Sequence, residues 1–227
     1  NISNLITLMA GITIIYGSIK ALKSNNLKER LAFSTVSQLS YVVIAASTLT
    51  SFGITAAIFH LLAHAFGKIT LFFAAGSIYT SLHKTEISEL RGVGYQMPIT
   101  MVCFSLAALS MIGLPPTAGF VSKWYLFSGA MLEEYWIIIG IISVSTLLNI
   151  AYFSPIIFSA FFQKPIEMES LNINEKPSQR FDHYRFYGNL EAPLPIIISM
   201  IVTVTGIFIL FLFPDIAVFT TSKILGE

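Results

Sequence analysis

Charged side chains are scarce in this sequence. Asp, Glu, Lys and Arg make up 11% of the 227 residues, hydrophobic residues make up 55%, and the mean hydropathy is +0.75. A soluble globular domain carries roughly 25% charged residues. The composition therefore excludes an ordinary soluble domain and predicts a polytopic membrane protein. The formal net charge of +1 offers no basic surface for nucleic acid, so we expect no nucleic-acid partner.

Cysteine is nearly absent too, since the sequence contains only Cys103. This excludes an internal disulfide and a cysteine-rich metal site. The sequence also lacks a glycine-rich phosphate loop and a nucleophile elbow. His60 and His64 have the spacing of paired zinc ligands, but the glutamate general base of that motif is missing, so we expect no metal. We predict neither covalent chemistry nor a cofactor for this segment.

Six segments have the length of membrane-spanning helices. They are expected at 2–19, 31–51, 54–79, 97–130, 135–162 and 193–213. Between them we expect a basic turn, a tight turn at Ser51–Gly53, a polar loop from Thr80 to Gln96, a short turn at Glu133 and Glu134, and a hydrophilic extramembrane loop from Gln163 to Glu191. The predicted fold class is all-α, a polytopic bundle of about six transmembrane helices. The chain opens without a methionine or a signal-peptide pattern, so we expect it to begin within a longer protein.

Basic residues gather in the connections that six spans place on one side of the membrane. Ten Lys and Arg lie there, against Lys223 alone on the opposite side. The ten are Lys20, Lys23, Lys28, Arg30, Lys84, Arg91, Lys164, Lys176, Arg180 and Arg185. Because basic loops stay in the cytoplasm, we predict a multi-pass protein of the cell inner (cytoplasmic) membrane, with both ends of this segment on the outer face.

Three basic side chains occupy the third span, at His60, His64 and Lys68. In a helix each step of four residues rotates by about 40°, so the three project from nearly one face. Ionisable groups inside a membrane usually face the protein interior or a water-filled path. Imidazoles that titrate near neutral pH and a lysine removed from water are suited to a proton relay. The alternative is that the histidines only bond across helices and that Lys68 reaches an interface.

The fourth span is too long for one simple helix, and Gly113-Leu114-Pro115-Pro116 interrupts it. The two prolines remove backbone donors and disfavour helix at Leu114. We predict a second half-helix from near Thr117 that carries Lys123. Broken helices mark ion sites, because irregular backbone at membrane depth is tolerated only around cavities or inside protein. An ordinary proline kink with Lys123 near an interface is the alternative.

Polar residues in the second span are expected to line the same path, namely Ser34, Ser37 and Gln38. No Asp or Glu falls at membrane depth between the loops. Hard metal cations prefer oxygen ligands, carboxylates above all. A segment whose membrane interior holds only bases therefore favours the movement of protons over the binding of a metal cation.

Three stretches resemble one known family, the antiporter-like proton-conducting membrane subunits of respiratory complex I, Mrp-type cation/proton antiporters and membrane-bound hydrogenases. Lys28–Tyr41 resembles "DIKRxLAYSTxSQxGY", Ile58–Lys68 resembles "FHxxxHAxxK", and Gly113–Lys123 resembles "G(L/I)PPxxGFxSK". One departure is Asn26, where the family usually has an acidic residue. The sequence around the break and Glu191-Ala192-Pro193 look most like the D subunit group of Mrp-type antiporters.

The resemblance implies a fold of fourteen core helices with two inverted five-helix repeats. Residues 1–162 would form the second repeat, 163–192 a cytoplasmic loop, and 193–227 the last transmembrane helix with a short tail. The first repeat would be missing. The family's essential lysine on the second broken helix corresponds to Lys123, and its central lysine and histidines correspond to Lys68, His60 and His64.

Two functions of different classes follow from the resemblance. The first is the proton-conducting part of a monovalent cation antiporter that exchanges Na+ for protons. The second is a proton-pumping subunit of NADH:quinone oxidoreductase or membrane-bound hydrogenase, and only then would the chain belong to an enzyme. Both imply other membrane subunits as partners within the lipid bilayer. A third alternative is a structural membrane subunit whose buried bases only fix helix packing.

Overall fold

The computed structural model describes residues 2–163 and 190–225. Most of the hydrophilic loop predicted from Gln163 to Glu191 lies outside these residues. The described elements are α1 (Ile2–Lys23), α2 (Leu27–Ser47), α3 (Ser51–Leu82), a short 3₁₀ turn (Ile87–Glu89), α4 (Val93–Gln96), α5 (Pro98–Ile112), α6 (Ala118–Leu132), α7 (Trp136–Phe162), α10 (Leu194–Leu212) and α11 (Asp215–Leu225).

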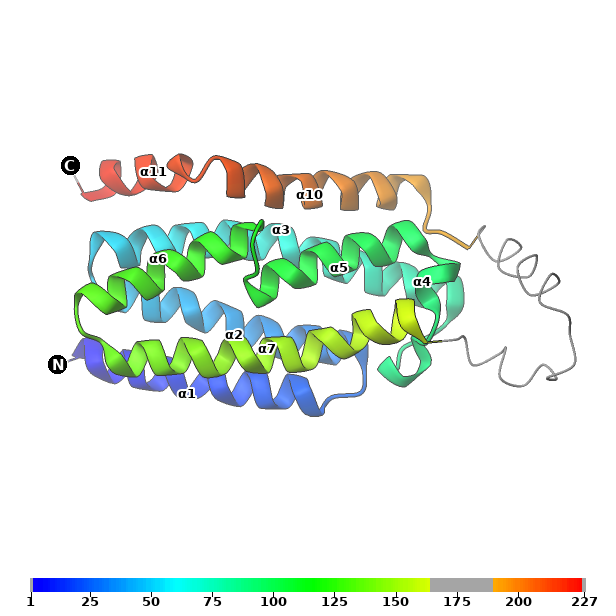
Figure 1. The fold of residues 1–227 in the computed structure, drawn as a ribbon, viewed down its shortest axis with the longest axis horizontal. Helices are drawn as coiled ribbons and strands as arrows, with labels where there is room; N and C mark the ends of the chain where they lie inside the picture. Colours follow the sequence, from blue (N-terminus) through cyan, green and yellow to red (C-terminus); the bar gives the residue numbers. More distant parts are fainter. Residues whose placement is uncertain (1, 164–189, 226–227) are drawn as a thin grey trace, which may run out of the picture.

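The long helices lie side by side along one axis, as Figure 1 shows. Among the described residues, α1, α3, α7 and α10 are long and apolar enough to cross a membrane. Helix α2 runs between α1 and α3, and the shorter α5 and α6 follow one another along the bundle. The start of α1 and the end of α11 lie at the same end of the molecule. The predicted all-α bundle is confirmed.

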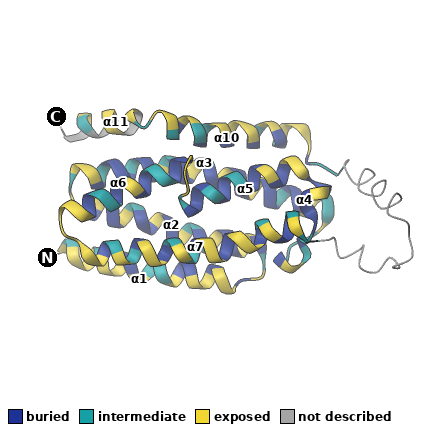
Figure 2. Ribbon diagram, viewed as in Figure 1, coloured by how far each residue is buried: buried dark blue, intermediate teal, exposed yellow. Residues whose placement is uncertain are grey.

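Helix α3 is the centre around which the others pack, because it contacts α2, α5, α6, α10 and α11. Buried residues face the inside of the bundle and exposed residues face outward, as Figure 2 shows. Large apolar side chains remain on the outer surface, such as Leu147 at 68% and Leu194 at 72% exposed. Such continuous apolar surface suits a lipid environment rather than water. The bundle thus places α3 where its polar residues are screened from lipid.

Several element boundaries differ from the predicted ones because side-chain caps set them. Helix α2 begins at Leu27 rather than near Leu31, since the Asn26 side chain accepts a hydrogen bond from the Glu29 backbone N–H at 3.2 Å. The prediction of a tight turn at Ser51–Gly53 was wrong. These residues form the first turn of α3, and Thr50 caps it by accepting from the Gly53 N–H at 3.0 Å.

We expect Asn26→Ser to preserve the stability of the protein, and Asn26→Ala to lower its free energy of unfolding by about 1 kcal/mol, because only the alanine removes the capping acceptor. Thermal unfolding of both variants in detergent measures the effect. Equal midpoints for the two variants would show that the cap contributes nothing.

The end of the chain also differs from the prediction of a short tail, because helix α11 follows α10 directly. Pro214 has no backbone N–H, and α10 ends just before it at Leu212. Helix α11 then continues in the direction of α10, alongside α3 (Figure 1). The last pass along the bundle is therefore made by two consecutive helices.

Glu191 fastens the beginning of the last pass to the broken span. Its carboxylate accepts from the backbone N–H of Ile99 at 2.5 Å and from the Thr100 hydroxyl at 2.7 Å. A carboxylate at a helix N-terminus satisfies free N–H groups and complements the helix dipole. Glu191 thus fixes α5 from the end that is opposite to the break.

Candidate functional site in the membrane interior

His60, His64 and Lys68 point into the bundle from one face of α3. They are 5%, 7% and 6% exposed, respectively. The prediction that the three share an inward face of one helix is confirmed, and the alternative in which Lys68 reaches an interface is excluded. Together with Lys123, which is 7% exposed on α6, they are called the basic cluster below.

The Lys68 amine binds the first half of α2. Its Nζ donates to the carbonyl oxygen of Leu31 at 2.9 Å and to the hydroxyl of Ser34. Ser34 in turn donates to the same Leu31 carbonyl, at 2.9 Å. The hydroxyl predicted to line the path is therefore a direct partner of the lysine. These contacts involve neutral oxygens, so they leave the charge of Lys68 unbalanced.

The break in the fourth span is present where predicted, about midway along the length of the bundle (Figure 1), and Leu114 to Pro116 are exposed there. Helix α5 ends at Ile112, and α6 starts at Ala118. In an unbroken helix, the carbonyls of Met111 and Ile112 would accept from the residues four positions later. Those residues are Pro115 and Pro116, which have no N–H. The two prolines therefore free these two carbonyls.

The Lys123 amine is hydrogen-bonded to both freed carbonyls. Its Nζ donates to Ile112 O at 2.7 Å and to Met111 O at 3.2 Å. The C-terminal end of a helix carries partial negative charge, which favours a cation. The two carbonyls at the end of α5 thus form the site for the Lys123 cation, in the role that a carboxylate would otherwise have. The structure shows Lys123 bound at the break, on carbonyls that the prolines leave without a backbone donor.

Gly113 makes room for this arrangement. Its φ of 89° lies in the left-handed region that favours glycine. A Cβ added at this position would also lie 2.7 Å from Cδ of Lys123. Backbone conformation and space both require glycine here, so the residue is part of the lysine site.

Gly113→Ala is expected to displace the Lys123 amine from the carbonyls of α5 and to reduce proton flux about tenfold, since one lost charge-assisted hydrogen bond is worth roughly 1.5–3 kcal/mol. Gly140→Ala is the matched control, because a Cβ there meets nothing within 4 Å. Proton flux in vesicles measures both variants. Equal flux in the two would show that the space at Gly113 does not matter.

Aromatic and hydroxyl groups connect the histidines to the break. Ser122 lies beside Lys123 in sequence, and its Oγ is 2.9 Å from Nδ1 of His60. The Tyr41 ring stacks on His60 with centroids 5.4 Å apart, and Lys123 Nζ lies 5.2 Å from the centroid of the same ring. His60 and His64 are themselves stacked at 6.5 Å. The basic cluster is therefore one contiguous group rather than two separate ones.

A second set of side chains, called the polar bridge below, connects Lys68 with Lys123 through α2 and α7. Its members are Ser34, Gln38, Asn149 and Tyr152. With the amide orientation that satisfies its neighbours, Asn149 Oδ1 accepts from Lys123 Nζ at 3.1 Å and from Gln38 Nε2 at 2.9 Å. Its Nδ2 donates to Tyr152 Oη at 2.7 Å. The Tyr152 hydroxyl also faces Gln38 and Ser34, the partner of Lys68.

The polar bridge confirms neither transport nor a role for any residue, but it shows which predicted lining residues meet the basic cluster. Ser34 and Gln38 do. Ser37 instead bonds the carbonyl of Ile14 at 3.1 Å and the hydroxyl of Ser18 at 2.8 Å, at the contact with α1.

Asn149, Tyr152, Tyr41 and Ser122 were not among the predicted site residues. For Asn149 a signal existed in the sequence, because it is the lone amide in the apolar run 136–162. Aromatic residues within apolar runs give no comparable signal.

Among the described residues, carboxylates are confined to the connections and helix ends. Glu29 begins α2, Glu133 and Glu134 lie between α6 and α7, and Glu191 precedes α10. Within the same part of the chain, no group of three or more His, Cys, Asp and Glu side chains could hold a metal ion.

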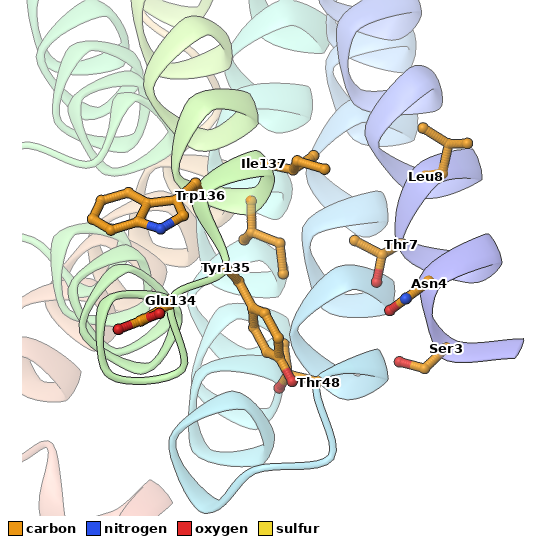
Figure 3. A pocket seen from close by; sticks show the side chains of 10 residues that line it. Ser3, Asn4, Thr7, Leu8, Thr48, Glu134, Tyr135, Trp136 and Ile137 are labelled. Atoms are coloured by element: carbon orange, nitrogen blue, oxygen red, sulfur yellow. The ribbon is translucent and has the colours of Figure 1, made fainter. Parts of the chain in front are cut away.

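The cavities lie apart from most of this cluster. One, of about 520 Å³, opens at the end of the bundle where α1 begins (Figure 3). Thr48, Glu134 and Tyr135 line it, and no member of the basic cluster does. Another, of about 410 Å³, reaches Lys123 from between α6 and α7 and is lined mainly by apolar and aromatic side chains such as Trp124 and Phe127.

Comparison with known proteins decides the family. Residues 1–149 match the family described as "NADH:quinone oxidoreductase/Mrp antiporter, TM". The chain belongs to this family. The resemblance carried by the three motifs is thereby confirmed, and with it the assignment as a multi-pass membrane protein.

Two curated members of the family illustrate the likeness. NADH-quinone oxidoreductase subunit N of Desulforudis audaxviator is 35% identical over 207 residues, which cover 91% of this chain and 40% of that protein. Subunit M of Rickettsia prowazekii is 32% identical over 191 residues, which cover 82% of this chain and 36% of that protein. The chain thus spans well under half the length of these relatives.

Chains of two solved membrane complexes share the fold. A chain of the Mrp complex from Dietzia sp. superimposes with a TM-score of 0.80 at 21% identity, covering 97% of this chain and 47% of that one. A chain of respiratory complex I from Thermus thermophilus gives a TM-score of 0.75 at 18% identity, covering 99% of this chain and 45% of that one.

Proposed function

We propose that this chain is part of a proton-conducting membrane subunit in which Lys68, His64, His60 and Lys123 form a buried relay. The observation that carries the proposal is the connection between the two lysines. The polar bridge joins them through hydrogen bonds, and the stacked His60 and His64 lie on α3 between Lys68 and the Tyr41 ring that Lys123 contacts. Four bases without an intramembrane carboxylate are suited to protons rather than to a bound metal cation.

In the proposed relay, Lys123 and the histidines take different steps. Lys123 holds a proton while its ammonium binds the freed carbonyls of Met111 and Ile112. It releases that proton when a positive charge arrives nearby, because like charges in a low-dielectric interior repel strongly. His60 contacts Ser122, and Nε2 of His64 has no hydrogen-bond partner among the described residues. That nitrogen is available to exchange a proton.

The primary candidate for the coupled process is exchange of Na+ for protons, as part of a cation antiporter. It is supported by lysine at position 123, by the Gly113–Thr117 sequence, and by the fold shared with a chain of an Mrp complex. The second candidate is a pumping subunit of NADH:quinone oxidoreductase, favoured by the names of the curated relatives. Both candidate functions use the same relay, and they differ in the partner subunits that drive it.

We further infer the topology. Residues 1–162 form the second of two inverted repeats, 163–192 a cytoplasmic loop and 193–227 the last pass, in the inner (cytoplasmic) membrane with both ends outside. The excess of basic residues on one side supports this orientation. One residue must leave that count, since Arg30 is buried at 7% exposure and donates to the Tyr152 carbonyl of α7.

The test is proton flux in vesicles that contain the complete protein with its co-purifying subunits and a pH-sensitive dye. Antiport predicts that a Na+ gradient drives proton movement and that choline does not replace Na+. The redox alternative predicts flux only while NADH and a quinone are being turned over. Absence of proton movement under both conditions would leave the structural alternative, in which the buried bases only fix packing.

A further inference from the structure

The Asn149 amide is the narrowest point of the polar bridge, and both of its ends have partners. One amide atom lies 3.1 Å from Lys123 Nζ and 2.9 Å from Gln38 Nε2. The other lies 2.7 Å from Tyr152 Oη and 3.2 Å from the carbonyl of Ser145. The residue is fully buried. Any coupling between Lys123 and Tyr152 through this bridge therefore passes through a group with one donor end and one acceptor end.

The charge of Lys123 decides which end of the amide suits it. An ammonium has three N–H donors and no acceptor. Met111 O, Ile112 O and Asn149 Oδ1 supply three acceptors, so the orientation with oxygen toward Lys123 fits the protonated lysine. A neutral amine has two N–H donors and a lone pair, so it fits an amide turned by 180° with Nδ2 toward it.

Two neighbours can satisfy the turned amide as well, whereas the carbonyl oxygen of Ser145 then lies 3.2 Å from Oδ1 and opposes the turn. In that orientation the Tyr152 hydroxyl donates to Oδ1 at 2.7 Å, and Nδ2 lies 3.4 Å from Met111 O. The Nε2 donor of Gln38 then faces the Nδ2 donor of Asn149. The Oε1 of Gln38 is buried without a hydrogen-bond partner in the described part of the chain. If the Gln38 amide turns together with Asn149, this oxygen gains the partner that it lacks.

We propose that Asn149 is a positioning residue whose amide turns with the charge of Lys123 and so reverses the hydrogen-bond direction through Tyr152 toward Ser34 and Lys68. The proposal rests on the proposed function, since it concerns how the two lysines of the relay sense one another. The amide itself carries no proton. Its turning makes the protonation of Lys68 and that of Lys123 interdependent.

The titratable groups that face this pair are few and come from three helices. They are Tyr41 of α2, His60 of α3 and Tyr152 of α7. The Tyr41 ring contacts both Lys123 and His60, and neither contact depends on the amide. Removing the amide therefore isolates its own contribution to the coupling.

The experiment follows the ¹⁵N signal of the Lys123 Nζ against pH in the complete protein. In the parent, Lys68→Met is expected to move the Lys123 titration midpoint by about one pH unit, a tenfold change in proton affinity. In the Asn149→Leu background, which keeps the side-chain shape without its polar atoms, the same substitution is expected to move it by much less. Ser199→Ala is the control, because this hydroxyl of α10 bonds its own helix at Pro195 O and does not line the cavity that reaches Lys123.

Flux measurements on the same proteins separate this inference from the function on which it rests. Asn149→Leu and Asn149→Asp are both expected to reduce proton flux about tenfold, the second because a carboxylate only accepts from Lys123 and cannot turn. Tyr152→Phe interrupts the same chain if Asn149→Leu does not assemble. Unchanged coupling and flux in these variants, while Lys123→Ala is inactive, would overturn the role of Asn149 alone. Full flux in Lys123→Ala would overturn the proposed function.

Discussion

Arg30→Met is expected to lower the free energy of unfolding by roughly 3 kcal/mol or more, because hydrogen bonds to charged groups contribute roughly 1.5–3 kcal/mol each. The buried guanidinium donates to Tyr152 O and Ser24 O, both at 2.8 Å, and to Leu22 O at 3.2 Å. It thereby ties the end of α1 to α7. A methionine would leave these carbonyls in the protein interior without their donor, and thermal unfolding in detergent should show a much lower midpoint.

Two controls make this result interpretable. Arg30→Lys keeps the charge but not the planar fork of donors, so an intermediate loss is expected. Lys28→Met removes an exposed cation of the same helix that lies 4.5 Å from the Tyr79 ring centroid. A contact of this kind contributes roughly 0.5–1 kcal/mol. Equal stability of Arg30→Met and Lys28→Met would mean that the buried contacts of Arg30 do not hold the bundle together.

Lys123→Ala is expected to show the opposite pattern, with flux abolished and assembly nearly normal. In the proposed relay the amine carries the proton, whereas the carbonyls at the break can be satisfied by water once the side chain is gone. Lys123→Arg should also fail, because a guanidinium stays protonated in proteins. Lys123→Glu should retain partial activity, since a carboxyl group can also gain and lose a proton. Proton flux in vesicles, normalised to the amount of assembled protein, measures all three.

The sequence predicted the break and the inward face of α3 because each depends on local geometry. Two adjacent prolines remove two backbone donors wherever the chain runs, and residues four apart share a helix face in any helix. It could also be predicted that Lys123 lies after the break. The loss of backbone donors for the Met111 and Ile112 carbonyls could have been derived too, from the proline positions alone.

Other features depend on packing between distant segments, which a single sequence does not specify. Arg30 was counted with the basic loop residues because its neighbours in sequence are charged, and only the fold shows it bonded to α7. Tyr41 and Tyr152 are aromatic residues within apolar runs, where a core residue and a site residue look alike. The boundary at Ser51 was missed because a capping threonine resembles a turn residue.

The central claim is that Lys68 and Lys123 belong to one proton path, and the most direct test compares the proton flux of Lys68→Ala, Lys123→Ala and the double variant in vesicles. On a single path, each single variant is expected to abolish the flux, and the double variant to be no worse than either. Two independent paths would leave residual flux in each single variant and remove it only in the double. That second result would contradict the relay.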